Sequence, residues 1–373
     1  MCIRDSDYAD LRDRGIVEGY YGYPYSVSVK KDLMHFMMRH KMNTYLYGAK
    51  SDPYHSNYWK DDYPATITAE QEKNGWLSQQ MVSELSATSA DTKVNFIWAI
   101  HPGNSFLGSN TAISDIMGKF DKMYQHGVRQ FAVFVDDVGV PSADADLKKN
   151  ADRLTELQHA IEEKYNKNFT SVTDTVRPLH FVPQIYCSSF APSAEVGRKF
   201  FEALSSTPDY VTVYITGAGV WSVPNSGDLA TYKNYLGRNL GWWWNYPCND
   251  NADGQIYPSD MYQNFTDMPA VWNDARLSST FENSVSLVSN PMQQGEVAKT
   301  PLFSVADYAW NTAGFDNNAS WEASFKAILK DDAAAAAYRH VAPYLRYNEP
   351  EQLSSLISSF KSLYALSLIH ISE

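Results

Sequence analysis

The sequence lacks the features that would place it in a membrane. No stretch reaches the roughly eighteen consecutive apolar residues at which an apolar run is interpreted as a transmembrane helix. The N-terminus also lacks the charged and then apolar layout of a secretory signal peptide. We therefore expect no membrane span.

Cysteine and basic residues are both scarce. The three cysteines, Cys2, Cys187 and Cys248, have neither the even count of a disulfide framework nor the spacing of a metal site. The nine histidines include no HExxH pattern, so we expect no metal and no cofactor. The net charge of −12 argues against a nucleic-acid partner, because a phosphate backbone recruits a surplus of lysine and arginine.

Aromatic residues, in contrast, are abundant. They make up 14% of the 373 residues and include 25 tyrosines and 10 tryptophans, which is more than a core requires. Such side chains suit a cleft that binds flat apolar faces with polar rims. The length and the 44% hydrophobic content allow one large domain with a small annex.

Short apolar runs rich in β-forming residues alternate with helical patterns along most of the chain. Ile113, Ile116 and Phe120, for example, have the spacing of the buried face of a helix. Parallel strands covered on both faces are continuous apolar runs, and right-handed crossovers close eight of them into a barrel. The predicted fold is therefore α/β, a (β/α)8 TIM barrel. The eight candidate strands are residues 15–19, 43–47, 94–100, 130–135, 179–185, 211–216, 240–244 and 284–289.

Two helix starts are marked by capping residues. Thr68 is followed three residues later by Gln71, which is the spacing of a capping box. Ser226 stands just ahead of an apolar pattern with helical period and is predicted to be the N-cap of a helix there.

The pattern becomes purely helical after Asn311. An alanine run at residues 333–337 is followed by apolar residues at helical spacing. We predict one barrel domain over residues 12–311 and a C-terminal helical annex over residues 312–366. We expect this annex to be truncated.

Both ends of the chain are unusual. The opening MCIRDS and the closing LSLIHISE fit no element around them, and both resemble translated sequencing-adapter sequence. We therefore expect residues 1–7 and 366–373 to be non-native and leave them out of the fold prediction. The natural protein is expected to extend beyond both ends.

Two adjacent carboxylates, Asp136 and Asp137, directly follow a candidate strand. In a barrel of this kind, catalytic groups lie at the carboxyl ends of the strands. Mutual repulsion and desolvation are expected to raise the pKa of at least one of the two, which would let it act as an acid near neutral pH. A pair of aspartates after a strand also commonly turns the chain or caps the next helix. The pair alone therefore does not decide its role.

The adjacency of the two aspartates favours one kind of glycoside hydrolysis over another. An ordinary retaining glycosidase needs two carboxylates about 5 Å apart on either side of the bond, and sequence neighbours do not easily straddle a sugar. In the substrate-assisted route, the 2-acetamido oxygen of the sugar is the nucleophile. One carboxylate then holds the acetamide N–H and the other protonates the leaving oxygen. Neighbouring aspartates suit that division.

Five motifs at the candidate strand ends resemble those of a known family. They are, in order, RGIVEGYYGYPYS, KMNTYLYGAKSDPYH, FAVFVDDV, WWWNYPCND and SNPM. By these motifs, about residues 12 to 311 resemble glycoside hydrolase family 84, the O-GlcNAcase and so-called hyaluronidase group. Five ordered matches make a chance resemblance improbable. The resemblance implies a retaining exo-β-N-acetylglucosaminidase that forms an oxazoline intermediate and acts on a glycan or glycoprotein bearing N-acetylglucosamine.

The resemblance also implies roles for individual residues. Asp136 would orient and polarise the acetamide, and Asp137 would be the general acid that later becomes the base. Tyr186 would hydrogen-bond the acetamide oxygen. Five further residues at strand ends would hold the sugar hydroxyls, although each also has an ordinary structural explanation. They are Gly19, Lys50, Asn245, Asp250 and Asn290.

An apolar wall near the acetamide methyl is predicted from Tyr21, Val220 and Trp243. Residues 242–244 are three consecutive tryptophans, and because side chains alternate along a strand, Trp243 is the one expected to face the pocket. Thr216, at the end of the sixth strand, is a further candidate. His101, before a Pro-Gly pair, is interpreted as a turn or pocket-rim residue rather than a ligand.

Two other functions stay open at this stage. An endo-acting hyaluronidase would need an open groove on both sides of the cut, whereas a pocket closed by Asp250, Asn245 and Lys50 would exclude an internal sugar. A carbohydrate-binding barrel that has lost its activity is the second, and the presence of Asp136 and Asp137 argues against it. We expect a bacterial protein that is secreted or periplasmic.

Overall fold

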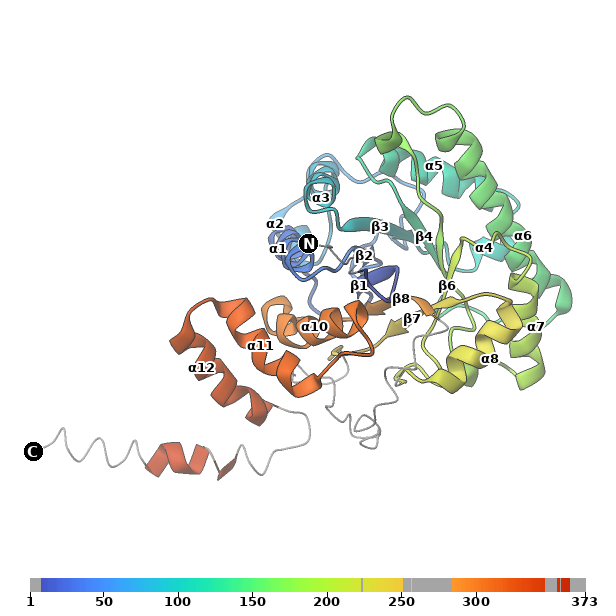
Figure 1. The fold of residues 1–373 in the computed structure, drawn as a ribbon. Helices are drawn as coiled ribbons and strands as arrows, with labels where there is room; N and C mark the ends of the chain where they lie inside the picture. The colour runs from blue at the N-terminus through green and yellow to red at the C-terminus, as the bar shows by residue number, and fades with distance from the viewer. Residues whose placement is uncertain are drawn as a thin grey trace, which may run out of the picture.

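The computed structural model describes residues 8–222, 224–250, 256, 284–345, 354–355 and 357–362. Eight parallel strands close into a barrel, with each strand bonded to the next and β8 to β1 (Figure 1). The predicted (β/α)8 barrel is confirmed, and every predicted strand overlaps an observed one. The strands are β1 (Asp13–Glu18), β2 (Thr44–Tyr47), β3 (Asn95–Ile100), β4 (Phe131–Phe134), β5 (His180–Val182), β6 (Thr212–Ile215), β7 (Leu240–Trp244) and β8 (Ser284–Ser289).

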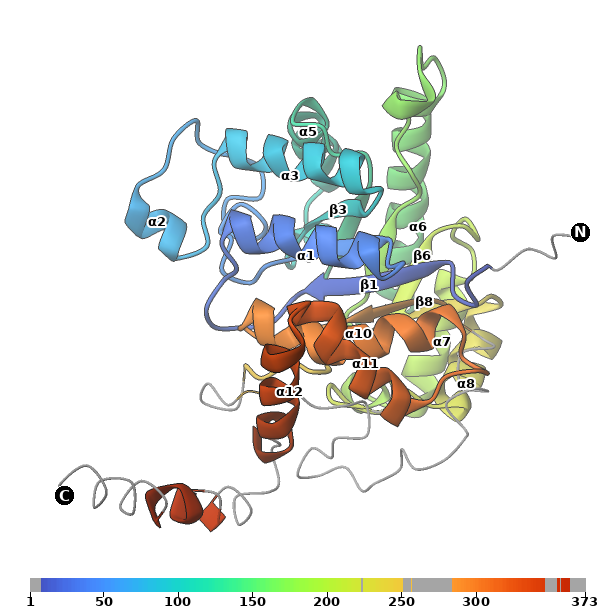
Figure 2. The same ribbon diagram turned by 60° about the vertical axis from the view of Figure 1, so that its left-hand side comes forward.

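Helices surround the barrel on its outside (Figures 1 and 2). The α-helices of the barrel region are α1 (Val27–Arg39), α2 (Ala69–Lys73), α3 (Gln79–Thr92), α4 (Ser105–Gly108), α5 (Ala112–Gln125), α6 (Asp144–Ile161), α7 (Ala194–Leu204), α8 (Ser226–Leu236) and α10 (Gly295–Trp310). A π-helical turn, η1 (Glu162–Asn166), extends α6, and the 3-10 turns η2 (Val172–Asp174) and η3 (Ser188–Phe190) flank β5.

The strands are buried on both faces, and successive side chains enter different cores. Val17, Leu46 and Trp243 belong to the cluster inside the barrel. Their strand neighbours, such as Ile16 and Tyr45, pack between the sheet and the helices. This period of two follows from the pleat of a β-strand. It places Trp243 inside and Trp242 and Trp244 outside, which confirms the predicted alternation.

One of the two predicted helix starts is confirmed. Thr68 and Gln71 form a capping box at the start of α2, in which each side chain bonds the other residue's backbone N–H. The prediction for Ser226 is wrong by one residue. Asn225 is the N-cap of α8 and accepts a bond from Asp228 N, so Ser226 is the first helical residue.

In the described part of the chain, three helical elements with defined bounds follow the barrel. They are α11 (Asn317–Leu329), α12 (Asp332–Val341) and η4 (Ala342–Leu345). Figure 2 shows α11 beside α10 and α12 beside α11, outside the ring of strands. Trp321, Phe325 and Ala335 form a small core between α11 and α12. The predicted boundaries of the barrel and the annex remain predictions, and residues 1–7 and 366–373 lie outside the described residues.

Within the described part of the chain, no helix is both long enough and apolar enough to cross a membrane.

Candidate active site

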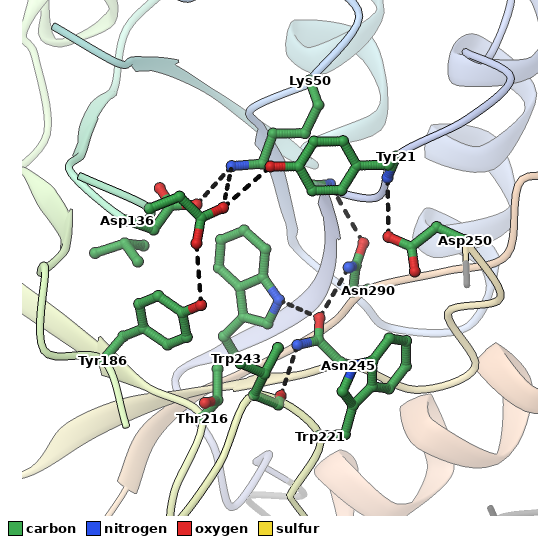
Figure 3. A pocket seen from close by; sticks show the side chains of 14 residues that line it. Tyr21, Lys50, Asp136, Tyr186, Thr216, Trp221, Trp243, Asn245, Asp250 and Asn290 are labelled. Carbon is green, nitrogen blue, oxygen red and sulfur yellow. Dashed lines mark hydrogen bonds and ion pairs between the residues drawn. The ribbon is translucent and has the colours of Figure 1, made fainter. Parts of the chain in front are cut away.

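A cavity of about 140 Å³ lies at the carboxyl ends of the barrel strands (Figure 3). All twelve residues predicted to catalyse or to bind the substrate line it, so the structure brings every one of them together. They are Gly19, Tyr21, Lys50, Asp136, Asp137, Tyr186, Thr216, Val220, Trp243, Asn245, Asp250 and Asn290. Their roles in catalysis and binding remain predictions.

Two lining residues, Val182 and Trp221, were missed by the sequence analysis. Val182 ends β5 and belongs to the cluster inside the barrel, which the alternation of side chains along that strand would have shown. Trp221 follows Val220 in a loop rich in glycine and serine after β6. A tryptophan in such a loop after a barrel strand was the signal that could have found it.

Asp136 is held at the base of the cavity by a buried ion pair. Lys50, from the loop after β2, places its Nζ 2.5 Å from Asp136 Oδ2. The exposed fractions of the two side chains are only 12% and 9%. The other carboxylate oxygen, Oδ1, is buried and has no hydrogen-bond partner among the residues that the structure describes. That oxygen is therefore an acceptor available to a ligand.

The expected rise in pKa does not occur at Asp136. Burial by itself raises the pKa of this carboxyl, but the charges of Lys50 and His101 and the bond from Lys50 outweigh burial and hold it below its ordinary value. The rise expected for at least one of the two aspartates is therefore not found at Asp136, because its nearest strong charge is the Lys50 ammonium. Since the pKa is lower than in the unfolded chain, the charged form stabilises the fold above the unfolded pKa. This contribution is lost as the pH falls through the folded pKa.

Asp137 has a different environment from its neighbour. Its side chain is 45% exposed and lies 4.0 Å from Lys50 Nζ. The Tyr21 hydroxyl donates to Asp137 Oδ2 at 3.0 Å, and the Tyr186 hydroxyl donates to Oδ1 at 3.3 Å. The φ of Asp137 is +58°, so this residue turns the chain in the left-handed region. The pair does not cap the next helix, because the N-cap of α6 is Ala143.

The two tyrosines beside Asp137 stay protonated. Burial and the nearby aspartates raise the pKa of Tyr186 above its ordinary value. Burial also raises the pKa of Tyr21, and the two aspartates add to this while Lys50 opposes it. Both phenols are therefore hydrogen-bond donors at neutral pH. The resemblance implied that the Tyr186 hydroxyl binds an acetamide oxygen. In the structure this hydroxyl donates to Asp137 Oδ1, 3.3 Å away.

A network of amides forms the opposite side of the cavity. Trp243 Nε1 and Asn290 Nδ2 both donate to Asn245 Oδ1, at 2.8 Å and 2.9 Å. Asn245 Nδ2 donates to the carbonyl of Val220 at 2.8 Å, and Asn290 Oδ1 accepts from Gly19 N at 3.3 Å. Figure 3 shows Trp243 between this network and Asp136. These bonds fix the ring of Trp243 in the cavity.

The remaining predicted residues differ in how much bonding capacity they keep. Asp250 accepts from Tyr21 N at 3.0 Å through Oδ2, while its Oδ1 is buried without a partner in the described part of the chain. Asp250 Oδ1 is therefore an acceptor available to a ligand. Thr216 donates its hydroxyl to the carbonyl of Gly219 at 2.7 Å. Its hydroxyl oxygen keeps the capacity to accept a hydrogen bond.

Gly19 is required by the close approach of Trp243. A Cβ at position 19 would lie 2.3 Å from Cζ2 of the Trp243 ring. We expect Gly19→Ala to displace this ring, to weaken binding of N-acetylglucosamine, and to lower the free energy of unfolding by about 1–3 kcal/mol. Chemical denaturation and calorimetric titration measure the two effects.

Gly118→Ala is the matched control for Gly19→Ala. Position 118 lies within α5, and a methyl group added there would have nothing within 4 Å beyond the helix's own backbone and its chain neighbours. Replacing a helical glycine with alanine is expected to stabilise by about 0.5–1 kcal/mol and to leave ligand binding unchanged. Unaltered binding in Gly19→Ala would show that Trp243 does not shape the sugar site.

The fold and the site define a (β/α)8 barrel of the glycoside hydrolase class, with paired carboxylates and an aromatic wall at the carboxyl ends of the strands. Residues 14–343 match the family described as NAGidase, beta-N-acetylglucosaminidase. The chain belongs to this family, and the resemblance to glycoside hydrolase family 84 is confirmed.

Similar proteins agree with this assignment. Protein O-GlcNAcase from Rattus norvegicus and that from Mus musculus are each 29% identical over 177 residues, which is 47% of this chain and 18% of each relative. A structure titled "Structure of CpGH84D" is 30% identical, with a TM-score of 0.72, over 89% of this chain and 50% of that one. An O-GlcNAc hydrolase mutant of Thermobaculum terrenum, 24% identical with a TM-score of 0.71, covers 95% and 72% and shows the fold alone. The match thus spans under a fifth of the length of the two curated relatives.

Proposed function

We propose that this chain hydrolyses terminal β-linked N-acetylglucosamine with retention of configuration, using the sugar's own acetamide as nucleophile. One observation carries the proposal. Two adjacent aspartates share a cavity but differ in environment, since Asp136 is buried and paired with Lys50 whereas Asp137 is 45% exposed and bonded to two phenols. The family match and the names of the mammalian relatives support the choice of sugar.

In the first step, Asp136 and Asp137 act on opposite parts of the substrate. The free Oδ1 of Asp136 accepts the acetamide N–H, which makes the acetamide oxygen a better nucleophile. This oxygen attacks the anomeric carbon, and the bond from that carbon to the leaving oxygen breaks. Protonated Asp137 gives its proton to the leaving oxygen as the bond breaks. The products are an alcohol and a protonated oxazoline, whose N–H donates to Asp136, and Asp137 is left as a carboxylate.

In the second step, the roles of acid and base at Asp137 reverse. Its carboxylate takes a proton from water, and the resulting hydroxide equivalent attacks the anomeric carbon and opens the oxazoline. Two displacements at the same carbon leave the configuration retained. Asp137 ends protonated and ready for another substrate. Its exposure of 45% allows both a leaving group and a water to reach it.

The size of the cavity favours exo action. Its volume of about 140 Å³ is below the ~300–1,000 Å³ of sites for drug-sized ligands, and so suits one sugar rather than a chain. The bonded amides of Asn245 and Asn290 form one side of it. Hydrolysis of a chromogenic β-N-acetylglucosaminide, with the β-glucoside as control, tests the proposal. Equal rates on both would contradict it, because the glucoside has no acetamide.

A stable mimic of the oxazoline is expected to bind much more tightly than the product. A thiazoline fused to the sugar ring has the geometry of the intermediate, and compounds of this kind bind at least about 10²-fold better than ground-state ligands. Calorimetric titration against N-acetylglucosamine measures the ratio. Equal affinities would argue strongly against participation of the acetamide.

A further inference from the structure

We propose that His101 is a positioning residue for both aspartates, an inference that rests on the proposed function. His101 directly follows β3, and β3 is bonded to β4, which leads into Asp136. The sequence analysis interpreted His101 as a turn or pocket-rim residue. Its side chain is 15% exposed, contacts Asp136, and is not among the residues that line the cavity.

The contact with Asp136 is made to the backbone. His101 Nε2 lies 2.8 Å from the main-chain oxygen of Asp136. A carbonyl oxygen only accepts, so Nε2 must carry the proton and donate. This oxygen belongs to the peptide unit that joins Asp136 to Asp137. His101 therefore holds the plane of the peptide that sets the two carboxylates relative to each other.

That peptide precedes a residue in an unfavourable conformation. Asp137 has a φ of +58°, in the left-handed region that residues with a side chain seldom adopt, and this conformation needs support from its surroundings. The bond from His101 supplies such support on the N-terminal side of Asp137. Lys50 holds the side chain of the same residue, because its Nζ is paired with the Asp136 carboxylate. The two contacts together fix the direction of both acids.

His101 leaves Asp136 Oδ1, the proposed acceptor of the acetamide N–H, without a hydrogen bond. Its Nε2 is 3.6 Å from Asp136 Oδ1, which is longer than a hydrogen bond. Oδ1 therefore stays available to the acetamide N–H. A histidine that served only to neutralise Asp136 would be expected to donate to the carboxylate itself.

The imidazole of His101 is itself held in place by His55. The backbone N–H of His101 donates to the His55 carbonyl at 2.8 Å, and the two rings meet edge to face with centroids 5.8 Å apart. His55 Nδ1 donates to the Ala99 carbonyl at 2.7 Å. Burial is the main cause that lowers the pKa of His55 to about 3, so its ring is neutral. His55 thus packs against His101 without adding a charge near Asp136.

The test compares His101→Gln with His101→Asn. The amide nitrogen of glutamine stands at the level of imidazole Nε2 and reaches the Asp136 carbonyl, whereas that of asparagine is one atom shorter. We expect His101→Asn and His101→Ala to lower kcat about 10²-fold, as displacement of a catalytic group by about 1 Å does. KM is expected to change little, and His101→Gln to recover most of the rate. The loss is expected with both good and poor aryl leaving groups, because both aspartates are affected.

A matched control is His126→Ala. His126 Nε2 lies 3.0 Å from Asp62 Oδ1, its side chain is 14% exposed, and it is not in the cavity. We expect wild-type kcat in this variant. Wild-type kcat in His101→Ala, or equal kcat in the folded glutamine and asparagine variants, would overturn the inference while the proposed function stands. An inactive wild-type protein would overturn both.

Discussion

Asp137→Asn is expected to lower kcat/KM by roughly 10²–10⁴-fold on substrates with a poor leaving group, and far less on those with an acidic one. The variant keeps the shape of the side chain and its neighbours Tyr21 and Tyr186, but it has no proton to transfer. A leaving group that departs easily as an anion does not need that proton. The deficit should therefore grow with the pKa of the leaving group.

A series of aryl β-N-acetylglucosaminides measures this dependence. The control is Asp152→Asn on α6, whose side chain is 55% exposed and pairs with Lys148 outside the cavity. This variant is expected to have wild-type activity, since an exposed pair of this kind contributes little. A deficit in Asp137→Asn that is the same for every leaving group would contradict its assignment as the general acid.

Asp136→Asn is expected to lower kcat by about 10²–10³-fold on every substrate in the series, as the removal of one preorganised electrostatic contact does. An amide in place of the carboxylate no longer stabilises the positive charge that develops on the acetamide nitrogen. It also leaves the Lys50 ammonium buried without its partner at 2.5 Å. The loss concerns formation of the oxazoline and so does not depend on the leaving group.

Two further measurements separate this effect from misfolding. Chemical denaturation reports the cost of the unpaired lysine, because removal of one member of a buried ion pair costs about 3–5 kcal/mol. Binding of the thiazoline is expected to weaken more in Asp136→Asn than in Asp137→Asn, since Asp136 is the proposed partner of the ring nitrogen. Recovery of full activity with acidic leaving groups in Asp136→Asn would exchange the roles of the two residues.

Much of the site could be predicted because of how parallel strands meet. The carboxyl ends of all strands lie at one end of the barrel, so polar residues after different strands must converge there. This is why Lys50, Asp136 and Asn290, far apart in the sequence, line one cavity. The alternation of side chains along β7 likewise identified Trp243, among three consecutive tryptophans, as the one that faces the inside of the barrel.

The features that could not be predicted from the sequence are contacts between residues that are far apart in the chain and close in space. The lowered pKa of Asp136 was not predicted, because Lys50 is 86 positions away in the sequence and 2.5 Å away in space. In sequence, the nearest charge to Asp136 is Asp137, and from that neighbour alone repulsion is expected to dominate. The contact of His101 with the Asp136 carbonyl is hidden for the same reason, since it joins the ends of two adjacent strands.

The bonded amides beside Trp243 have a consequence for how a sugar would be received. Asn245 and Asn290 already satisfy each other, the indole N–H and the Val220 carbonyl through bonds within the protein. Their orientation is therefore set during folding, and a ligand need not reorder them. A preorganised surface of this kind loses little side-chain entropy on association, so more of the contact energy appears as affinity. The rigidity of this wall would then favour ligands whose shape already complements it.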